Sequence, residues 1–231
     1  MEWQIIDTGK ASAEKNMAID KALLQDLKHT KQPILHLYDW DKPAATFGHF
    51  LDPYKYLKKE KIIEHGLDLA KRPTGGGIIF HLSDFAFSIL IPASHPNCSL
   101  KTLDNYAFVN GLIAKVIQNA LNLEETPQLL DHEPTASHPN AHFFCMAKPT
   151  QNDVMWKGKK LSGGAQRRTK YGFLHQGTIS MDLPPLSLLK MLLINEGIEK
   201  DMETNTCIFK GTQAHLFSAF HRINEFIYFP S

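Results

Sequence analysis

The residues best suited to chemistry lie in two glycine-containing stretches that carry cationic side chains. The first, KRPTGGGIIFH at residues 71–81, places Arg72 just before three consecutive glycines. Because glycine has no Cβ, such a turn lets a ligand approach the backbone, and its N–H groups with a guanidinium suit carboxylate or phosphate oxygens. The second, KGKKLSGGAQ at residues 157–166, offers Lys160 as a compact positive charge for an acyl or phosphate oxygen. Both stretches also fit plain hairpin turns, and the first matches neither a Walker A loop nor a dinucleotide-binding fingerprint.

Composition limits the classes of protein to which this chain can belong. Its 231 residues fit one domain, and 43% of them are hydrophobic, enough for a sizeable core. No segment is apolar for the about 20 residues that a membrane span needs. The net charge of +1 gives no reason to expect nucleic-acid binding. The N-terminus lacks the pattern of a signal peptide, which predicts a cytoplasmic protein. Together with the net charge and the absence of a long apolar segment, this predicts neither a nucleic-acid nor a membrane partner.

The cysteines and histidines do not form the patterns typical of a structural site. Cys98, Cys145 and Cys207 are odd in number and make no CxxC pair, which argues against a disulfide framework or a zinc site. The histidines of the polar, proline-rich segment 124–140 are irregularly spaced, and we predict an exposed loop there. We therefore expect no metal site and no permanently bound cofactor.

The elements that must position the two glycine stretches follow from the hydrophobic pattern. Strands are predicted at residues 3–7, 34–38, 44–48, 78–80, 85–91, 143–145, 154–156 and 173–181. Helices are predicted at residues 17–27, 53–66, 103–121, 186–193 and 213–226. This order indicates an α+β fold with a mixed, largely antiparallel sheet flanked by helices. Because no linker divides the chain, we expect residues 1–231 to form a single domain.

Five segments, taken in order, resemble one family of enzymes. KRPTGGGIIFH at 71–81 resembles the Arg-[Arg/Pro]-[Ser/Thr]-Gly-Gly-[Gly/Arg]-x-x-x-His signature of the lipoate–protein ligase and octanoyltransferase family. WKGKKLSGGAQR at 156–167 looks like that family's Gly-[Lys/Arg]-Lys-[Val/Ile]-[Ser/Ala]-Gly-[Ser/Asn]-Ala motif, and LHQGTI at 174–179 resembles its Leu-His-His-Gly-[Ser/Thr]-[Leu/Ile] strand. NMAID at 16–20 and PAATFG at 43–48 also sit where the family has comparable segments.

The resemblance implies the catalytic-domain fold shared by biotin and lipoate–protein ligases, and an enzyme of protein lipoylation. Such an enzyme joins lipoate or octanoate, as an amide, to a lysine of a carrier domain. The carriers it implies are lipoyl domains of 2-oxoacid dehydrogenase complexes and the glycine-cleavage H protein. Our first expectation is a ligase that uses ATP and Mg²⁺ to make an acyl-adenylate.

The same resemblance assigns roles to individual residues. Lys160 matches the family's catalytic lysine, placed to hold the acyl carbonyl oxygen. The positions that match the surroundings of the acyl group and its activating moiety are Arg72, Thr74, Gly75, Gly76, Gly77, His81, Gly163, Gly164, Ala165, His175 and Gly177.

The alternative is a transferase that takes octanoate from octanoyl-acyl carrier protein through an acyl-cysteine. The segment CMAKPT at 145–150 looks like the Cys-x-x-x-Pro-[Ser/Thr] context of one transferase branch, which makes Cys145 the candidate nucleophile. Gly77 and the pair Asn152-Asp153 instead resemble the ligases, and a buried cysteine is also a common inert core residue. A second alternative is an inactive homologue that only binds acyl groups or carriers.

Many ligases carry an additional C-terminal domain, and we expect none here because only ~45 residues follow Pro185, fewer than an ordinary domain. The sequence leaves open the route, the preference for lipoate or octanoate, the carrier, the need for an accessory subunit and the oligomeric state.

Overall fold

A seven-stranded sheet forms the centre of the molecule. The computed structural model describes residues 2–226. In spatial order the strands are β1 (Gln4–Ala11), β2 (Ile34–Trp40), β6 (Asp84–Pro92), β10 (Gly172–Ser180), β9 (Lys159–Thr169), β8 (Val154–Trp156) and β7 (Gln128–Leu129). Only β1 and β2 pair in parallel, and every other neighbouring pair is antiparallel. The predicted mixed, largely antiparallel sheet is therefore confirmed.

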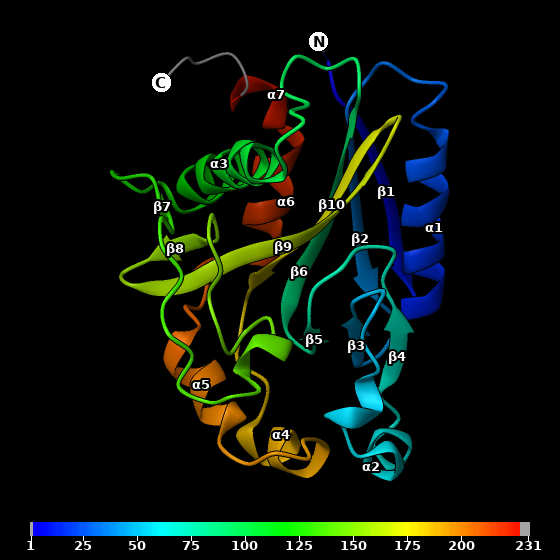
Figure 1. Cartoon of the computed structure of the whole chain (residues 1–231). Helices are drawn as coiled ribbons and strands as arrows, with labels where there is room; N and C mark the ends of the chain where they lie inside the picture. Colours follow the sequence, from blue (N-terminus) through cyan, green and yellow to red (C-terminus); the bar gives the residue numbers. More distant parts are fainter. Residues whose placement is uncertain (1, 227–231) are drawn as a thin grey trace.

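A second sheet of three strands lies at one end of the first (Figure 1). Its order is β4 (Asp68–Lys71), β3 (Ala44–Phe47) and β5 (Ile78–His81). The glycine turn of residues 72–77 connects β4 to β5, and β5 runs directly into β6 of the large sheet. The turn is thereby placed where the two sheets meet.

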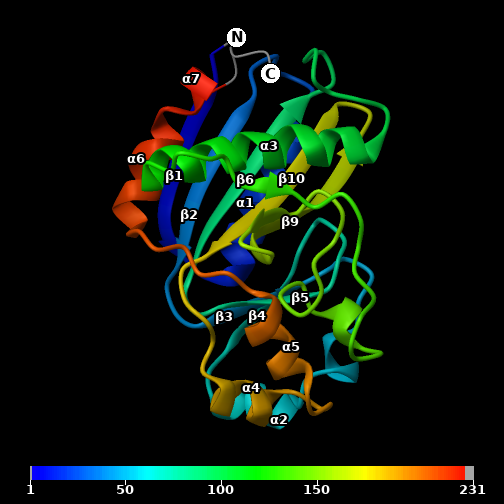
Figure 2. The same cartoon turned by 90° about the vertical axis from the view of Figure 1, so that its left-hand side faces the viewer.

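Helices cover both faces of the large sheet. On one face lie α3 (Thr102–Leu121), α6 (Gln213–His221) and α7 (Ile223–Phe226), and on the other lies α1 (Ala13–Asp26), as the two views show (Figures 1 and 2). The buried face of α3 repeats at helical spacing through Val109, Ile113, Val116 and Ile117 and packs against the strands. The Ser12 side chain accepts the N–H of Lys15 and so caps α1.

The small sheet has its own apolar cover. The short helices η1 (Pro53–Lys55), α2 (Lys59–Glu64), α4 (Leu186–Leu192) and α5 (Ile198–Asn205) lie at this end of the molecule (Figures 1 and 2). Buried side chains of α2, α4 and α5 form one cluster with Ile78 and Phe80 of β5. No helix within residues 2–226 is long and apolar enough to cross a membrane.

Several predicted elements differ from the structure. The predicted strand at 143–145 is wrong, because residues Ala141–Phe143 form the 3₁₀ turn η2 and Cys145 follows it in a turn. The predicted helix 53–66 is divided into η1 and α2, since Leu57 instead bridges to Leu193. The predicted helix 213–226 breaks at Arg222, and α5 was not predicted because its sequence is largely polar.

Candidate active site

A cavity of about 430 Å³ lies at the junction of the two sheets. The two glycine stretches, some 80 residues apart in the sequence, meet on its wall, together with β5, β9, β10 and the turn that follows η2. Of the residues predicted for the site, those that line the cavity are Arg72, Gly75, Gly76, Gly77, His81, Cys145, Lys160, Gly163, Gly164, Ala165 and Gly177. Thr74 and His175 lie outside this lining.

Arg72 holds the glycine turn together. Its guanidinium is buried and donates to the carbonyl oxygens of Gly75 (3.0 Å), Gly77 (2.9 Å) and Thr46 (3.1 Å). The turn therefore directs carbonyl oxygens at the guanidinium. The guanidinium also donates to the Thr46 hydroxyl at 3.0 Å, so four of its five N–H donors have protein partners. In this structure Arg72 shapes the turn rather than presenting a free fork of donors to an anion.

Two glycines in this region allow close backbone contacts. A Cβ on Gly48 would lie 2.0 Å from the carbonyl oxygen of Gly76, and a Cβ on Gly77 would lie 2.3 Å from that of Phe143. The second contact places the turn after η2 directly against the start of β5, where the Cys145 N–H donates to the Ile78 carbonyl (2.9 Å). The glycine at position 77 thus permits the position of Cys145.

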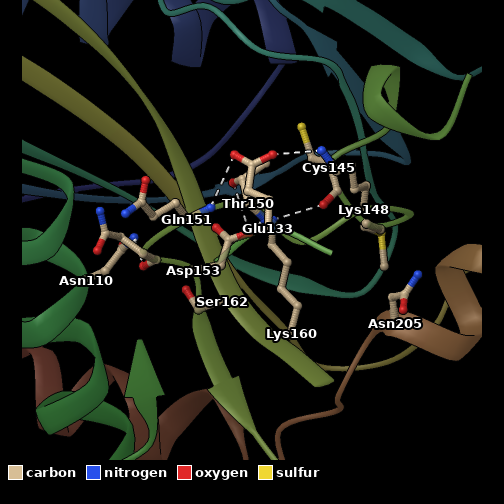
Figure 3. Close-up of polar contacts among 12 residues, drawn as sticks. Asn110, Glu133, Cys145, Lys148, Thr150, Gln151, Asp153, Lys160, Ser162 and Asn205 are labelled. Atoms are coloured by element: carbon tan, nitrogen blue, oxygen red, sulfur yellow. Dashed lines mark hydrogen bonds and ion pairs between the residues drawn. The ribbon is translucent and has the colours of Figure 1, made fainter. Parts of the chain in front are cut away.

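Lys160 lies on β9 and spans two segments of the wall (Figure 3). Its ammonium is 2.7 Å from a carboxylate oxygen of Asp153 and donates to the backbone carbonyl of Cys145 at 3.0 Å. The Asp153 side chain is only 3% exposed and also accepts the Thr150 N–H (2.7 Å). The backbone of Lys160 is held in turn, because its carbonyl accepts the N–H of Cys207 at 2.7 Å. Lys160 is therefore fixed from both sides.

Cys145 differs from the other two cysteines in its surroundings. All three are partly buried free thiols, but only Cys145 lines the cavity. Burial raises the pKa of Cys98 and the pKa of Cys207, which favours their unreactive thiol form. Among the described residues, Cys145 is thus the one cysteine that lines the cavity, and its backbone carbonyl accepts the Lys160 ammonium.

The glycines of β9 make room for neighbouring side chains. A Cβ on Gly163 would lie 2.6 Å from the Lys160 side chain and 2.3 Å from that of Asp153. A Cβ on Gly164 would collide with the imidazole of His175, 2.2 Å away. The glycine pair therefore keeps Lys160 and Asp153 together on one side and admits His175 on the other.

His81 is a buried, fully engaged histidine. Its Nδ1 lies 2.6 Å from a carboxylate oxygen of Asp84, its Nε2 lies 2.8 Å from the Thr46 hydroxyl, and its ring stacks on Trp40. Because Thr46 also binds Arg72, His81 is connected to the glycine turn through that hydroxyl. Both ring nitrogens are occupied, so His81 serves as part of the cavity wall.

His175 lies behind the cavity wall. Successive residues of a strand face opposite sides of the sheet, and β10 turns His175 toward Phe87 and Tyr106 under α3. Complete burial lowers the pKa of His175 to about 3, which keeps the ring neutral. Gln166 donates to its Nδ1 at 2.9 Å. The expected pocket position at 175 is filled instead by its neighbour Gln176.

Gln176 belongs to a buried network that the sequence analysis missed. Its amide nitrogen donates to Asp20 (2.6 Å), and its amide oxygen accepts the hydroxyl of Thr74 (2.7 Å). Asp20 also accepts from Ser88 (2.7 Å) and lies 2.8 Å from Nδ1 of His36. The alternation of β10 was the available signal, since it places 174, 176 and 178 together on one face.

Further polar residues of the wall were also not predicted for the site. Glu133, Lys148 and Tyr106 line the cavity, and the first of these comes from the segment expected to be an exposed loop. That segment carries no periodic pattern, so nothing in the sequence indicated where its side chains would lie. Among residues 2–226 no group of three or more histidine, cysteine or carboxylate side chains is placed to hold a metal ion.

Comparisons with known proteins agree on one family. A family model described as the lipoyl protein ligase A/B catalytic domain matches residues 12–220. The octanoyltransferase LipM of Kyrpidia tusciae is 30% identical over 200 residues, 82% of this chain and 70% of that protein. The octanoyltransferase LipM of Bacillus subtilis is 27% identical over 208 residues, 88% of this chain and 74% of that protein.

Solved structures support the fold. A crystal structure of lipoate-protein ligase A bound with ATP has a TM-score of 0.72 at 18% identity, and the match covers 96% of this chain and 84% of the ligase chain. Plasmodium falciparum LipL1 in complex with lipoate has a TM-score of 0.71 at 20% identity, and the match covers 98% of this chain and 62% of the LipL1 chain. At these identities the likeness confirms the predicted ligase catalytic-domain fold and nothing finer.

Proposed function

Because the chain belongs to the lipoyl protein ligase A/B catalytic-domain family and is an enzyme of that family, we propose that it is a cysteine-dependent octanoyltransferase. It takes an octanoyl group from octanoyl-acyl carrier protein onto Cys145 and passes it to a lysine of a lipoyl carrier domain. The observation that carries this proposal is the free Cys145, which lines the same cavity as Lys160. The backbone carbonyl of Cys145 accepts a hydrogen bond from the Lys160 ammonium. The names of the two relatives reported above, both octanoyltransferases, at 30% and 27% identity, support it.

The chemistry needs two acyl transfers at one thiol. In the first, the Cys145 sulfur attacks the thioester carbonyl of the donor, a new carbon–sulfur bond forms, and the donor thiol leaves with the proton. In the second, the carrier amine attacks the acyl-cysteine, an amide forms, and the Cys145 thiol is released. Lys160, held by Asp153, is placed to stabilise the negative charge that develops on the acyl oxygen in each step.

The ATP-dependent ligase of our first expectation is the second candidate. Gly77 and Asn152-Asp153 favour it by resemblance. Arg72 does not fit a phosphate clamp as it stands, because its guanidinium is bound to carbonyl oxygens of the glycine turn. We therefore derive no step through ATP or Mg²⁺.

The test offers two acyl donors to the wild-type protein with a purified lipoyl carrier domain. One reaction contains lipoate with ATP and Mg²⁺, and the other contains octanoyl-acyl carrier protein without ATP. Cys145→Ser is compared with Cys98→Ser, a matched control whose thiol lies outside the cavity lining. We expect ATP-independent transfer that Cys145→Ser abolishes and Cys98→Ser retains, with an octanoyl adduct on Cys145 by mass spectrometry.

Other results would change the assignment. ATP-dependent product that persists in Cys145→Ser would establish the ligase and make Cys145 a packing residue. Absence of product with either donor would favour the binding-only homologue or a missing accessory subunit. The carriers to be offered are lipoyl domains of 2-oxoacid dehydrogenase complexes and the glycine-cleavage H protein.

A further inference from the structure

A carboxylate from the segment between β7 and η2 reaches into the active-site cavity. Glu133 lines the cavity beside Cys145, Lys148 and Gln151 (Figure 3). It is the only aspartate or glutamate in the cavity lining formed by the described residues. Its carboxylate oxygens lie 2.7 Å from the Lys148 ammonium and 3.5 Å from the Gln151 N–H. The transfer chemistry described above assigns no role to this group.

The contact between Glu133 and Lys148 is open to exchange. The Glu133 side chain is 44% exposed and the Lys148 side chain 19% exposed, so water reaches the pair and the bond is weak. An incoming cation can therefore replace Lys148 at small cost. The Lys148 hydrogen bond lowers the pKa of Glu133, which keeps the carboxylate ionised while it waits for that cation.

We propose that Glu133 is the catalytic residue that receives the acceptor lysine of the carrier domain, displacing Lys148, and takes the proton that its ammonium must lose. This inference rests on the proposed transferase function. The Lys148 ammonium is a primary ammonium on a flexible stem, the same chemical group as the acceptor. Its present position against Glu133 marks the position of the substrate's nitrogen in the cavity that Cys145 also lines.

The proton and bond changes balance with Glu133 as the base. The acceptor enters as R–NH₃⁺ and gives one proton to the carboxylate, which leaves a neutral amine. The amine nitrogen bonds to the acyl carbon, the carbon–sulfur bond to Cys145 breaks, and the departing thiolate takes the second nitrogen proton. The products are the amide, the Cys145 thiol and a protonated Glu133, which returns its proton to water and binds Lys148 again.

Other bases of the cavity are engaged or buried. Both ring nitrogens of His81 have partners, and burial raises the pKa of Tyr106, whose hydroxyl accepts the Gln166 N–H (2.9 Å). Lys160 is held by Asp153. The exposed His142, also in the cavity lining, is the remaining competitor and serves as a comparison.

The experiment separates the two half-reactions. Acylation of Cys145 by octanoyl-acyl carrier protein is followed by mass spectrometry, and the isolated octanoyl-enzyme is then mixed with carrier domain in a rapid-quench apparatus. In Glu133→Gln we expect acylation at the wild-type rate and transfer slowed about 10²-fold, the ordinary size of a general-base effect. Lys148→Met removes the competing cation, so the carrier concentration that gives half-maximal transfer should fall. Glu124→Gln, an exposed glutamate before β7 and outside the cavity lining, is the matched control.

Each outcome decides between the alternatives. Transfer from octanoyl-Glu133→Gln at the wild-type rate would overturn the role of Glu133. A selective loss in His142→Asn, with none in Glu133→Gln, would assign the base to His142 instead. If the wild-type protein forms no acyl-enzyme at all, the proposed function fails first, and this result differs from a defect confined to the second half-reaction.

Discussion

At the scale of single residues, the ion pair of Lys160 and Asp153 should contribute both to the stability of the fold and to the proposed acyl transfer. Replacing Lys160 by Met leaves a carboxylate that is 3% exposed without its ammonium partner. We expect turnover to fall at least 10²-fold, since the charge on the acyl oxygen loses its partner. The free energy of unfolding should fall by about 1–3 kcal/mol, the cost of an unpaired buried acceptor. Steady-state transfer assays and urea unfolding measure the two effects.

A double variant separates those two effects. Lys160→Met combined with Asp153→Asn removes the unpaired charge, so stability should recover toward that of wild type while activity stays lost. If turnover of Lys160→Met matched that of wild type, Lys160 would have no catalytic role. If the double variant were no more stable than the single one, the ion pair would not account for the loss of stability.

Which residues surround the cavity was only partly predictable from the sequence. The motifs identified the glycines, Lys160 and Cys145, because these positions are consecutive in short segments. Partners that come from distant segments, such as Asp20 for Gln176 and Glu133 for Lys148, carry no local signal. His175 was assigned to the cavity lining from the motif alone. Side chains of β10 alternate between the two faces of the sheet, and this alternation turns His175 to the face opposite the cavity.

At the scale of elements, the contact between β5 and the turn after η2 determines where the thiol lies. In Gly77→Ala the new Cβ meets the Phe143 carbonyl at 2.3 Å, so this turn must move away from β5. We expect acylation of Cys145 to slow at least tenfold, with a loss of about 1–3 kcal/mol in stability from overpacking. Gly75→Ala is the matched control, because no atom lies within 4 Å of its Cβ position. Equal acylation rates in the two variants would contradict this account.

The long, regular elements were predictable, and the short ones were not. The helix predicted at 103–121 agrees with α3 because twenty residues repeat their apolar face every three or four positions. Residues 143–145 have the apolar composition of a strand, yet Phe143 and Phe144 pack against Tyr56, and the backbone closes into a turn. Tertiary packing outweighs local propensity in such short segments.

At the scale of the whole molecule, a neutral histidine inside the core makes stability depend on pH. The pKa of His175 is about 3 in the folded chain and near its ordinary 6.5 when unfolded. Between these values the unfolded state binds a proton that the folded state does not, so the free energy of unfolding falls as the pH falls from 6.5 toward 3. The contribution of His175 to this slope is at most about 1.4 kcal/mol per pH unit.

The comparison with His175→Gln isolates that contribution. Gln cannot take up a proton, so the free energy of unfolding of the variant should decline less steeply than that of wild type between pH 6.5 and pH 4. Urea unfolding at each pH measures both. Above pH 7 the two curves should run parallel. Identical slopes below pH 6.5 would show that burial does not depress the pKa of His175.

The hydrogen bond from Cys207 to the Lys160 carbonyl has a consequence for how the protein is made. A ribosome adds residues from the N-terminus onward, so Cys145 and Lys160 leave the exit tunnel before the segment that anchors Lys160 has been synthesised. Thr206, next to that anchor, also lines the cavity. In a nascent chain Cys145 is therefore present before the cavity that it lines is complete, and we expect the proposed acyl transfer to begin only when the segment around Thr206 and Cys207 has docked.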